Sequence, residues 1–250
     1  MLAASARSRL LDGILLACAL GCPAFLQAAG LTISPVVIEI DSPRKAIAVT
    51  VTNNGDHAVT FQTDTMIWKQ VNGVDQYEPT SELLIAPPIV RVRPNASQTF
   101  RVTLRVPTSS PVERSYRVIL EDISDELSSS GTASVAFKFT HNLPVMLAPT
   151  DKVFNAIRWK PCASEPAKPA AAEVCVHINN AGNRRVKVQN LTLAGNGWQH
   201  SVPFKEGINV SSGAEREWRI PLQAGQTGAL QSVQIFTARG ETIDAQAGGF

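Results

Sequence analysis

The sequence predicts an all-β protein made of two β-sandwich domains. Short runs rich in Val, Ile and Thr recur along the chain, separated by turn residues at the spacing of about 8–12 residues that is typical of sandwiches. No window of roughly 11 or more residues has the periodicity of an amphipathic helix. Of the 250 residues, roughly 220 follow an N-terminal segment, which suffices for two sandwiches of about 100 residues each.

The first domain, which we place at residues 30–148, opens with three strand candidates. In the middle candidate, Ile47, Val49 and Val51 alternate with Ala or Thr, the period of a half-buried strand. The segment Asn53-Asn54-Gly55-Asp56 suits a hairpin turn, because Asn and Gly tolerate positive φ. These three candidates are residues 31–40, 46–52 and 59–68.

Further strand candidates complete this domain and make up a second one. The remaining candidates of the first domain are residues 89–92, 97–106, 114–123 and 134–147. The turn residues Ala148-Pro149-Thr150-Asp151 mark the boundary to a second domain, which we place at residues 149–250. Its strand candidates are residues 153–159, 173–179, 185–194, 214–222 and 230–237.

The candidate at 134–147 carries its apolar residues on one face, since alternate residues of a strand point to the same side. His141 is the only polar member of this row. The strand is either a core strand of the first sandwich or one that projects in part at a sheet edge and is offered to another protein. Pro144 agrees with an edge, because proline lacks the N–H that an inner strand donates. The row consists of Val135, Phe137, Phe139, His141, Leu143, Val145 and Leu147.

Composition and charge exclude several classes of protein. With 44% hydrophobic residues and a net charge of +2, the chain is neither disordered nor basic enough for a nucleic-acid partner. No zinc, catalytic-triad or phosphate-binding pattern surrounds its histidines, so we expect no enzymatic activity, no metal and no cofactor. Trp159, Trp198 and Trp218 either line a sugar-binding face or, as aromatic residues more commonly do, lie in the core.

Residues 1–29 have the features of an export signal. Arg7 and Arg9 precede an apolar stretch at 10–26, and small residues at 28–29 suit cleavage. Two alternatives remain: lipidation of Cys18 at a lipoprotein-type site, or retention of the segment as an anchor. We expect simple cleavage and therefore an exported mature chain.

Export leaves two cysteines, Cys162 and Cys175, in a compartment where disulfides form. They lie 13 positions apart, on either side of a loop rich in Pro and Ala. We predict a disulfide between them. A metal site is the alternative, but one nearby histidine, His177, does not give the paired spacing of zinc ligands.

Ordered segments over most of residues 31–149 carry a family resemblance. The matching segments are Leu31-Thr32-Ile33-Ser34-Pro35, Ala48-Val49-Thr50-Val51-Thr52-Asn53, Trp68-Lys69-Gln70, Glu78-Pro79, Pro87-Pro88-Ile89-Val90, Arg93-Pro94, Tyr116-Arg117-Val118-Ile119-Leu120-Glu121 and Leu143-Pro144-Val145. In order and spacing they resemble the periplasmic pilus-assembly chaperones of the chaperone–usher class, and most of all the archaic Csu-like branch. The second half resembles the family mainly in size and strand pattern.

The resemblance implies two immunoglobulin-like domains set at an angle around a cleft. It also implies a function: a periplasmic chaperone that binds and stabilises pilin subunits by donating a β-strand, and delivers them to an outer-membrane usher. The donor residues would be Val135, Phe137, Phe139 and His141. The alternative function is a secreted binding or adhesion module with two sandwiches, for which carbohydrate is a candidate ligand.

The sequence departs from the family at the residues that hold the carboxylate of a bound pilin. Two basic positions of other members fall on Val37 and Pro144, and a third, used in an interdomain ion pair, falls on Ala148. A basic residue from elsewhere is therefore needed if the pilin carboxylate is anchored at all. The candidates are Arg117, Lys138 and Arg105, each of which is otherwise a solvated surface cation.

Overall fold

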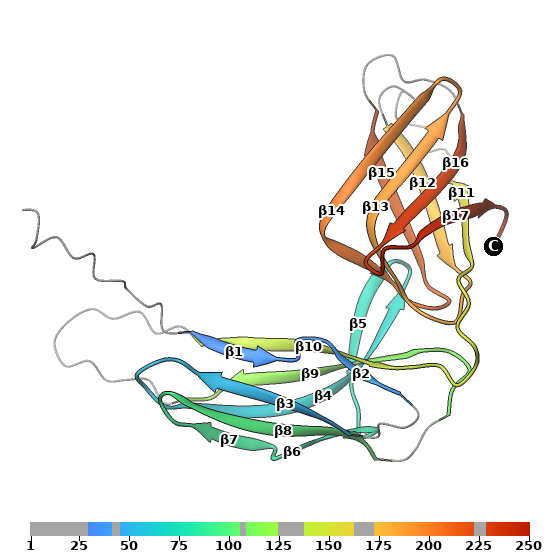
Figure 1. Cartoon of the computed structure of the whole chain (residues 1–250). Coiled ribbons are helices and arrows are strands. Elements are labelled where there is room, and N and C mark those ends of the chain that lie inside the picture. Colours follow the sequence, from blue (N-terminus) through green and yellow to red (C-terminus); the bar gives the residue numbers. More distant parts are fainter. Residues whose placement is uncertain (1–29, 42–45, 106–108, 125–137, 163–172, 223–228) are drawn as a thin grey trace, which may run out of the picture.

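The structure is a computed structural model that describes residues 30–41, 46–105, 109–124, 138–162, 173–222 and 229–250. All regular elements in these ranges are β-strands, arranged in two domains (Figure 1). The predicted all-β, two-sandwich fold is confirmed. The described ranges hold no helix with the length and apolar character needed to cross a membrane.

The first domain is a sandwich of two sheets. One sheet has the order β1-β3-β8-β6, and the other has the order β2-β10-β9-β4-β5, with β7 paired to β4. Their facing sides bury a common core that includes Phe61, Phe100 and Tyr116, each with no exposed surface. The strands are β1 (Leu31–Ser34), β2 (Ile38–Ile40), β3 (Ala46–Asn53), β4 (Val59–Val71), β5 (Val74–Pro79), β6 (Leu83–Ala86), β7 (Ile89–Val92), β8 (Ala96–Leu104), β9 (Arg114–Asp122) and β10 (Thr140–Leu147).

The predicted first strand, 31–40, is in fact two strands in different sheets. β1 pairs with β3 in the first sheet, whereas β2 pairs with β10 in the second. Pro35 lies between them, where the chain crosses from one sheet to the other. Since both pieces alternate Leu or Ile with polar residues, their composition does not reveal the crossing.

The second domain is formed by a seven-stranded sheet with the order β14-β13-β16-β17-β11-β12-β15. The strands are β11 (Ile157–Pro161), β12 (Glu173–Asn180), β13 (Val186–Gly195), β14 (Trp198–Val210), β15 (Glu215–Pro221), β16 (Leu230–Thr237) and β17 (Thr242–Ala247). Trp159, Trp198 and Trp218 are at most 8% exposed and belong to its core. Of the two interpretations of these residues, the core position is the one that the structure shows.

The two domains form an L, with the second domain standing at one end of the first (Figure 1). The hairpin formed by β4 and β5 reaches up to the base of the second domain, where the Gln70 amide donates to the carbonyl of Asn209 at 3.0 Å. Gln70 Oε1 accepts from the N–H of Ser211 at 2.8 Å. The outer face of the second sheet therefore becomes one wall of the angle between the domains.

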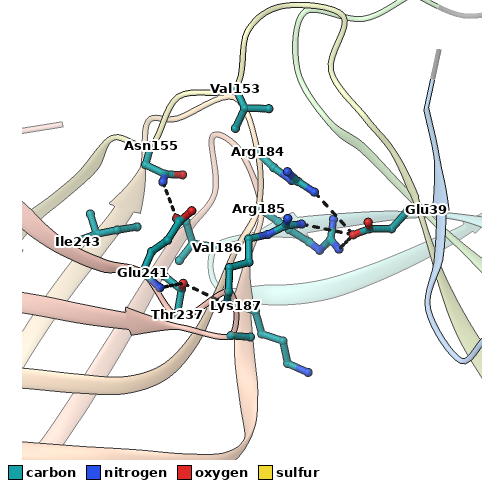
Figure 2. A pocket seen from close by; sticks show the side chains of 12 residues that line it. Glu39, Val153, Asn155, Arg184, Arg185, Val186, Lys187, Thr237, Glu241 and Ile243 are labelled. Atoms are coloured by element: carbon teal, nitrogen blue, oxygen red, sulfur yellow. Dashed lines mark hydrogen bonds and ion pairs between the residues drawn. The ribbon is translucent and has the colours of Figure 1, made fainter. Parts of the chain in front are cut away.

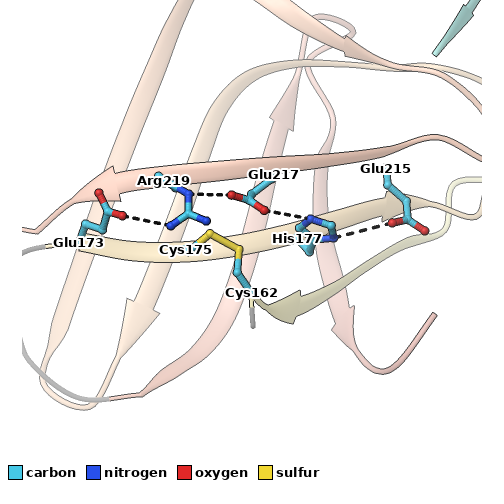
Figure 3. Close-up of a disulfide and its surroundings, with 7 residues drawn as sticks. All are labelled: Cys162, Glu173, Cys175, His177, Glu215, Glu217 and Arg219. Carbon is cyan, nitrogen blue, oxygen red and sulfur yellow. Dashed lines mark hydrogen bonds and ion pairs between the residues drawn. A yellow bond between two sulfur atoms is a disulfide. The ribbon is translucent and has the colours of Figure 1, made fainter. Parts of the chain in front are cut away.

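Cys162 and Cys175 form the predicted disulfide, with a Cα–Cα distance of 5.4 Å (Figure 3). It joins the residue after β11 to the neighbouring strand β12. Glu217 lies close to both sulfur atoms. Because the two sulfurs are bonded to each other, they do not offer the thiolate ligands that the alternative metal site needs.

The disulfide should stabilise the second domain. In a chain that starts at residue 30, we expect no free thiol in the unreduced, unfolded protein. Replacing both cysteines by serine (Cys162→Ser with Cys175→Ser) should lower the free energy of unfolding by about 2–4 kcal/mol, since the unfolded chain gains freedom. Thiol titration and denaturant melts measure both quantities. Two reactive thiols per wild-type chain would contradict the bridge.

Candidate functional site

Strand β10 has one side fully paired and the other side mostly open. Its eight residues pair with β9 along their whole length, from Thr140 with Glu121 to Leu147 with Arg114. On the other side β2 pairs with Val145–Leu147, and no described strand pairs with residues 140–144. Pro144 lies in this open part. The backbone of 140–144 is therefore a sheet edge that a further strand can join.

The apolar row of this strand divides into a buried part and a projecting part. Leu143, Val145 and Leu147 are at most 5% exposed and lie in the core of the first sandwich. Phe139, by contrast, is 56% exposed just before the strand begins. The described part of the row is thus core from Leu143 to Leu147 and projects at Phe139. Val135 and Phe137 lie outside the described residues.

His141 sits at the transition between these two parts. Its ring lies 6.3 Å from that of Phe61, edge-on, and is stacked 6.5 Å from that of Phe139. Burial lowers the pKa of His141 below 6.5, although the charge of Asp122 opposes this shift. The residue also borders a hollow of about 400 Å³ at this end of the sandwich. His141 is therefore positioned as a mostly neutral, half-buried member of the row.

Arg117 lies directly beside Pro144, one of the two positions at which the resemblance leads us to expect a basic residue. It is the cross-strand partner of Pro144 and lies on the outer face of the second sheet. Its guanidinium carbon is 4.0 Å from the ring centre of Trp68 and 5.6 Å from that of Tyr77, which are cation–π distances. Its Nε is buried without a hydrogen-bond partner. The neighbouring strand thus brings a cation to the place that Pro144 leaves uncharged.

The other two candidate cations are not gathered around Arg117. Lys138 is exposed just before β10, six residues and thus about 20 Å along the strand from Pro144. Arg105 follows β8 of the first sheet, the opposite layer of the sandwich. Of the three predicted cations, Arg117 alone is the cross-strand neighbour of Pro144.

A network of ion pairs joins the two domains beside β2, on the outer face of the second sheet (Figure 2). Glu113, 3% exposed, accepts from Nη1 of Arg185 at 2.6 Å, and Nη2 of Arg185 donates to Glu39 at 2.8 Å. Burial alone would raise the pKa of Glu39, but the hydrogen bond of Arg185 and the charges of Arg185, Arg239 and Arg184 together outweigh it and lower that pKa. Sequence reasoning missed these residues, because their positions show no pattern until the domains meet.

Comparisons with known proteins agree with this geometry. Residues 30–152 match the family described as pili and flagellar-assembly chaperone, PapD N-terminal domain. A search among curated proteins finds no match to this sequence.

Solved structures extend the similarity to both domains. The CsuC–CsuE chaperone–tip adhesion subunit pre-assembly complex, from archaic chaperone-usher Csu pili of Acinetobacter baumannii, matches with a TM-score of 0.67 and 19% identity over 88% of this chain and 100% of that chain. The class 5 fimbriae chaperone CfaA matches with a TM-score of 0.59 and 14% identity over 88% and 100%. The complex of the Salmonella enterica SafA pilin with the SafB chaperone gives 0.59 and 13% over 86% and 93%.

These similarities fix the class of protein. The N-terminal domain, residues 30–152, belongs to the pili and flagellar-assembly chaperone family, and the fold of the two domains together is similar to that of solved chaperone–usher chaperones. The family resemblance seen in the sequence is confirmed.

The burial of His141 should make the first domain sensitive to acid. Because the folded pKa is below 6.5, the unfolded chain binds more protons between the two values, and stability falls as the pH falls through that window. As the pH is lowered through this window, we expect the melting temperature to fall more steeply in wild type than in His141→Gln. His200→Gln, on β14 of the other domain, is the matched control for loss of an imidazole. If the melting temperature depends equally on pH in wild type and in His141→Gln, the lowered pKa of His141 is not the cause of the acid sensitivity.

Proposed function

We propose that this protein is a periplasmic chaperone that binds and stabilises pilin subunits by donating a β-strand, and delivers them to an outer-membrane usher. The observation that carries this proposal is the division of this segment: Leu143, Val145 and Leu147 are buried in the core, the backbone of 140–144 forms an open edge, and Phe139 projects just before the strand. An incomplete subunit that lacks one strand can pair with this edge and receive Phe139 in a pocket.

The donor row provides the affinity in this proposal. The backbone of 140–144 offers hydrogen bonds, while Val135, Phe137 and Phe139 offer large apolar side chains, with His141 at the next site. Burying each large side chain contributes roughly 1.5–3 kcal/mol. Three such groups therefore supply about 5–9 kcal/mol before the ordering of the chain is subtracted. Phe139 is the member of this set whose exposure the described residues support.

Arg117 is the cation that we assign to the carboxylate of the subunit. It stands beside Pro144 at the wall of the angle between the domains, and Trp68 and Tyr77 hold its guanidinium in place. A guanidinium binds a carboxylate through two parallel hydrogen bonds. A basic group on β9 thus takes the role that other members give to the donor strand itself.

Export to the periplasm belongs to the same proposal. The signal-like residues 1–29 lie outside the described residues, and the Cys162–Cys175 bridge suits an oxidising compartment. The family is one of chaperones rather than enzymes, and we assign no catalytic role. The alternative of a carbohydrate-binding module is not favoured, because the tryptophans that would line its face are buried.

The donor assignment is tested by two charge substitutions in one row. Phe139→Asp should leave the free chaperone folded, because Phe139 is 56% exposed, but should weaken subunit capture at least about tenfold. Leu143→Asp places a charge in the core and should unfold the domain. Melting temperature and the yield of co-purified subunit measure the two effects.

Thr140→Asp, at an exposed neighbouring position on the opposite face, is the control and should affect capture less. If Phe139→Asp melts as early as Leu143→Asp while its folded fraction still captures subunit, the donor role of this residue is wrong.

The carboxylate anchor is tested at Arg117. Arg117→Gln should lower affinity for the subunit about three- to tenfold, since a hydrogen bond to a charged group is lost at a partly exposed site. Arg101→Gln, on the outer side of β8 in the other sheet, is the matched control. Affinity is measured by competition between tagged variants for one subunit. Equal losses for both variants would show a general charge effect instead of an anchor.

A further inference from the structure

A cavity of about 290 Å³ lies where β2 of the first domain meets the second domain (Figure 2). Four cationic and two carboxylate side chains line it. One carboxylate, Glu241, already accepts from the amide of Asn155 at 3.0 Å. The cavity therefore has an excess of positive charge, which comes from Arg184, Arg185, Lys187 and Arg239.

The three arginines have fewer carboxylate acceptors than they can use. Arg185 is well bonded to Glu113 and Glu39. The Glu39 oxygen that it binds also contacts Arg239 at 3.4 Å and Arg184 at 3.7 Å. Arg184 Nε, although buried, has no hydrogen-bond partner and lies 3.5 Å from Glu113. A single carboxylate oxygen is thus shared by three guanidinium groups.

The charges around Arg184 also favour an additional carboxylate in this cavity. Burial lowers the pKa of Arg184, and the charge of the neighbouring Arg239 lowers it further. Guanidinium groups are best satisfied by planar carboxylates that accept two hydrogen bonds at once. A further carboxylate between Arg184 and Arg239 would supply these acceptors and reduce the repulsion between the two cations.

The cavity is also close to the open edge of β10. Glu39 is the middle residue of β2, whose neighbours in β10 are Val145 to Leu147. A strand added at residues 140–144 would lie in line with β2. The position opposite Pro144 is two residues, or roughly 7 Å, from Glu39. A subunit strand that reaches the position opposite Pro144 would therefore bring its side chains close to the arginines.

We propose that this cavity is a carboxylate-binding site, and that in the assembled complex it takes an acidic side chain of the bound subunit. This inference rests on the proposed function and adds a second contact, on the second domain, to the one at Arg117. The site is formed by Arg184 and Arg239, and Glu39 is the internal carboxylate that competes with the ligand for both of them.

The free chaperone provides the first test, with succinate as the probe. In wild type the arginine side-chain NMR signals should shift saturably as succinate is added. Arg239→Gln should weaken binding about three- to tenfold. Its melting temperature should stay close to that of wild type, because Arg239 is 43% exposed. Glu39→Gln should strengthen binding, since it removes the competing charge.

Arg101→Gln is again the matched control and should bind succinate as wild type does. Three outcomes overturn the site: no saturable shift in wild type, an equal loss in Arg101→Gln, or binding in Glu39→Gln no tighter than in wild type. Arg184→Gln gives a second variant that should reproduce the loss seen in Arg239→Gln.

The complex provides the second test. Subunit should dissociate faster from Arg239→Gln than from wild type, and the difference should shrink at high salt. The difference should persist with a subunit extended by two residues at its C-terminus, which displaces the terminal carboxylate. If the extension abolishes the difference in dissociation rate, the carboxylate that binds in the cavity is the terminal carboxylate of the subunit and not an acidic side chain. If wild type captures no subunit, the proposed function fails, whereas the succinate result still decides the site.

Discussion

The unsatisfied backbone edge of β10 is the constraint on which the rest of the structure depends. Buried backbone N–H and C=O groups need partners, and β9 provides them on one side along the whole strand. On the other side the three-residue β2 covers only Val145–Leu147. The first sandwich therefore has a complete sheet edge at Val145–Leu147 and an open one at residues 140–144, next to the exposed Phe139. A partner that lacks a strand fits this arrangement, because its sheet has room for a strand and β10 has an edge without one.

The domain junction keeps this edge accessible while it fixes the second domain nearby. Glu113 and Arg185 are almost fully buried, and such a pair gains little net stability, since both charges lose their water. Breaking it would leave an unpaired buried charge, so the pair restricts the geometry more than it strengthens the fold. Gln70, on β4 near the other side of the same sheet, makes a second contact with the second domain, and both contacts support the L-shaped arrangement.

Several elements were beyond sequence reasoning for identifiable reasons. β5 is exposed at all six positions and mostly polar, so it has no alternation to detect. β14 contains Pro203 and Gly207, which usually interrupt strands. The cluster of Glu39, Arg184 and Arg239 joins residues that are up to 200 positions apart. By contrast, the Cys162–Cys175 bridge was predictable, because export left a single possible pair.

The sequence by itself determined the all-β class, the two sandwiches, the family and the face on which the apolar row of β10 lies. A period of two assigns side chains to a face, but it says nothing about depth. Phe139 and Leu143 therefore look alike in the sequence, although one is 56% and the other 5% exposed. Only the tertiary structure separates them, because Leu143 packs into the core between the two sheets and Phe139 does not. Likewise, only the fold puts Arg117 next to Pro144, since cross-strand neighbours are set by register and not by order along the chain.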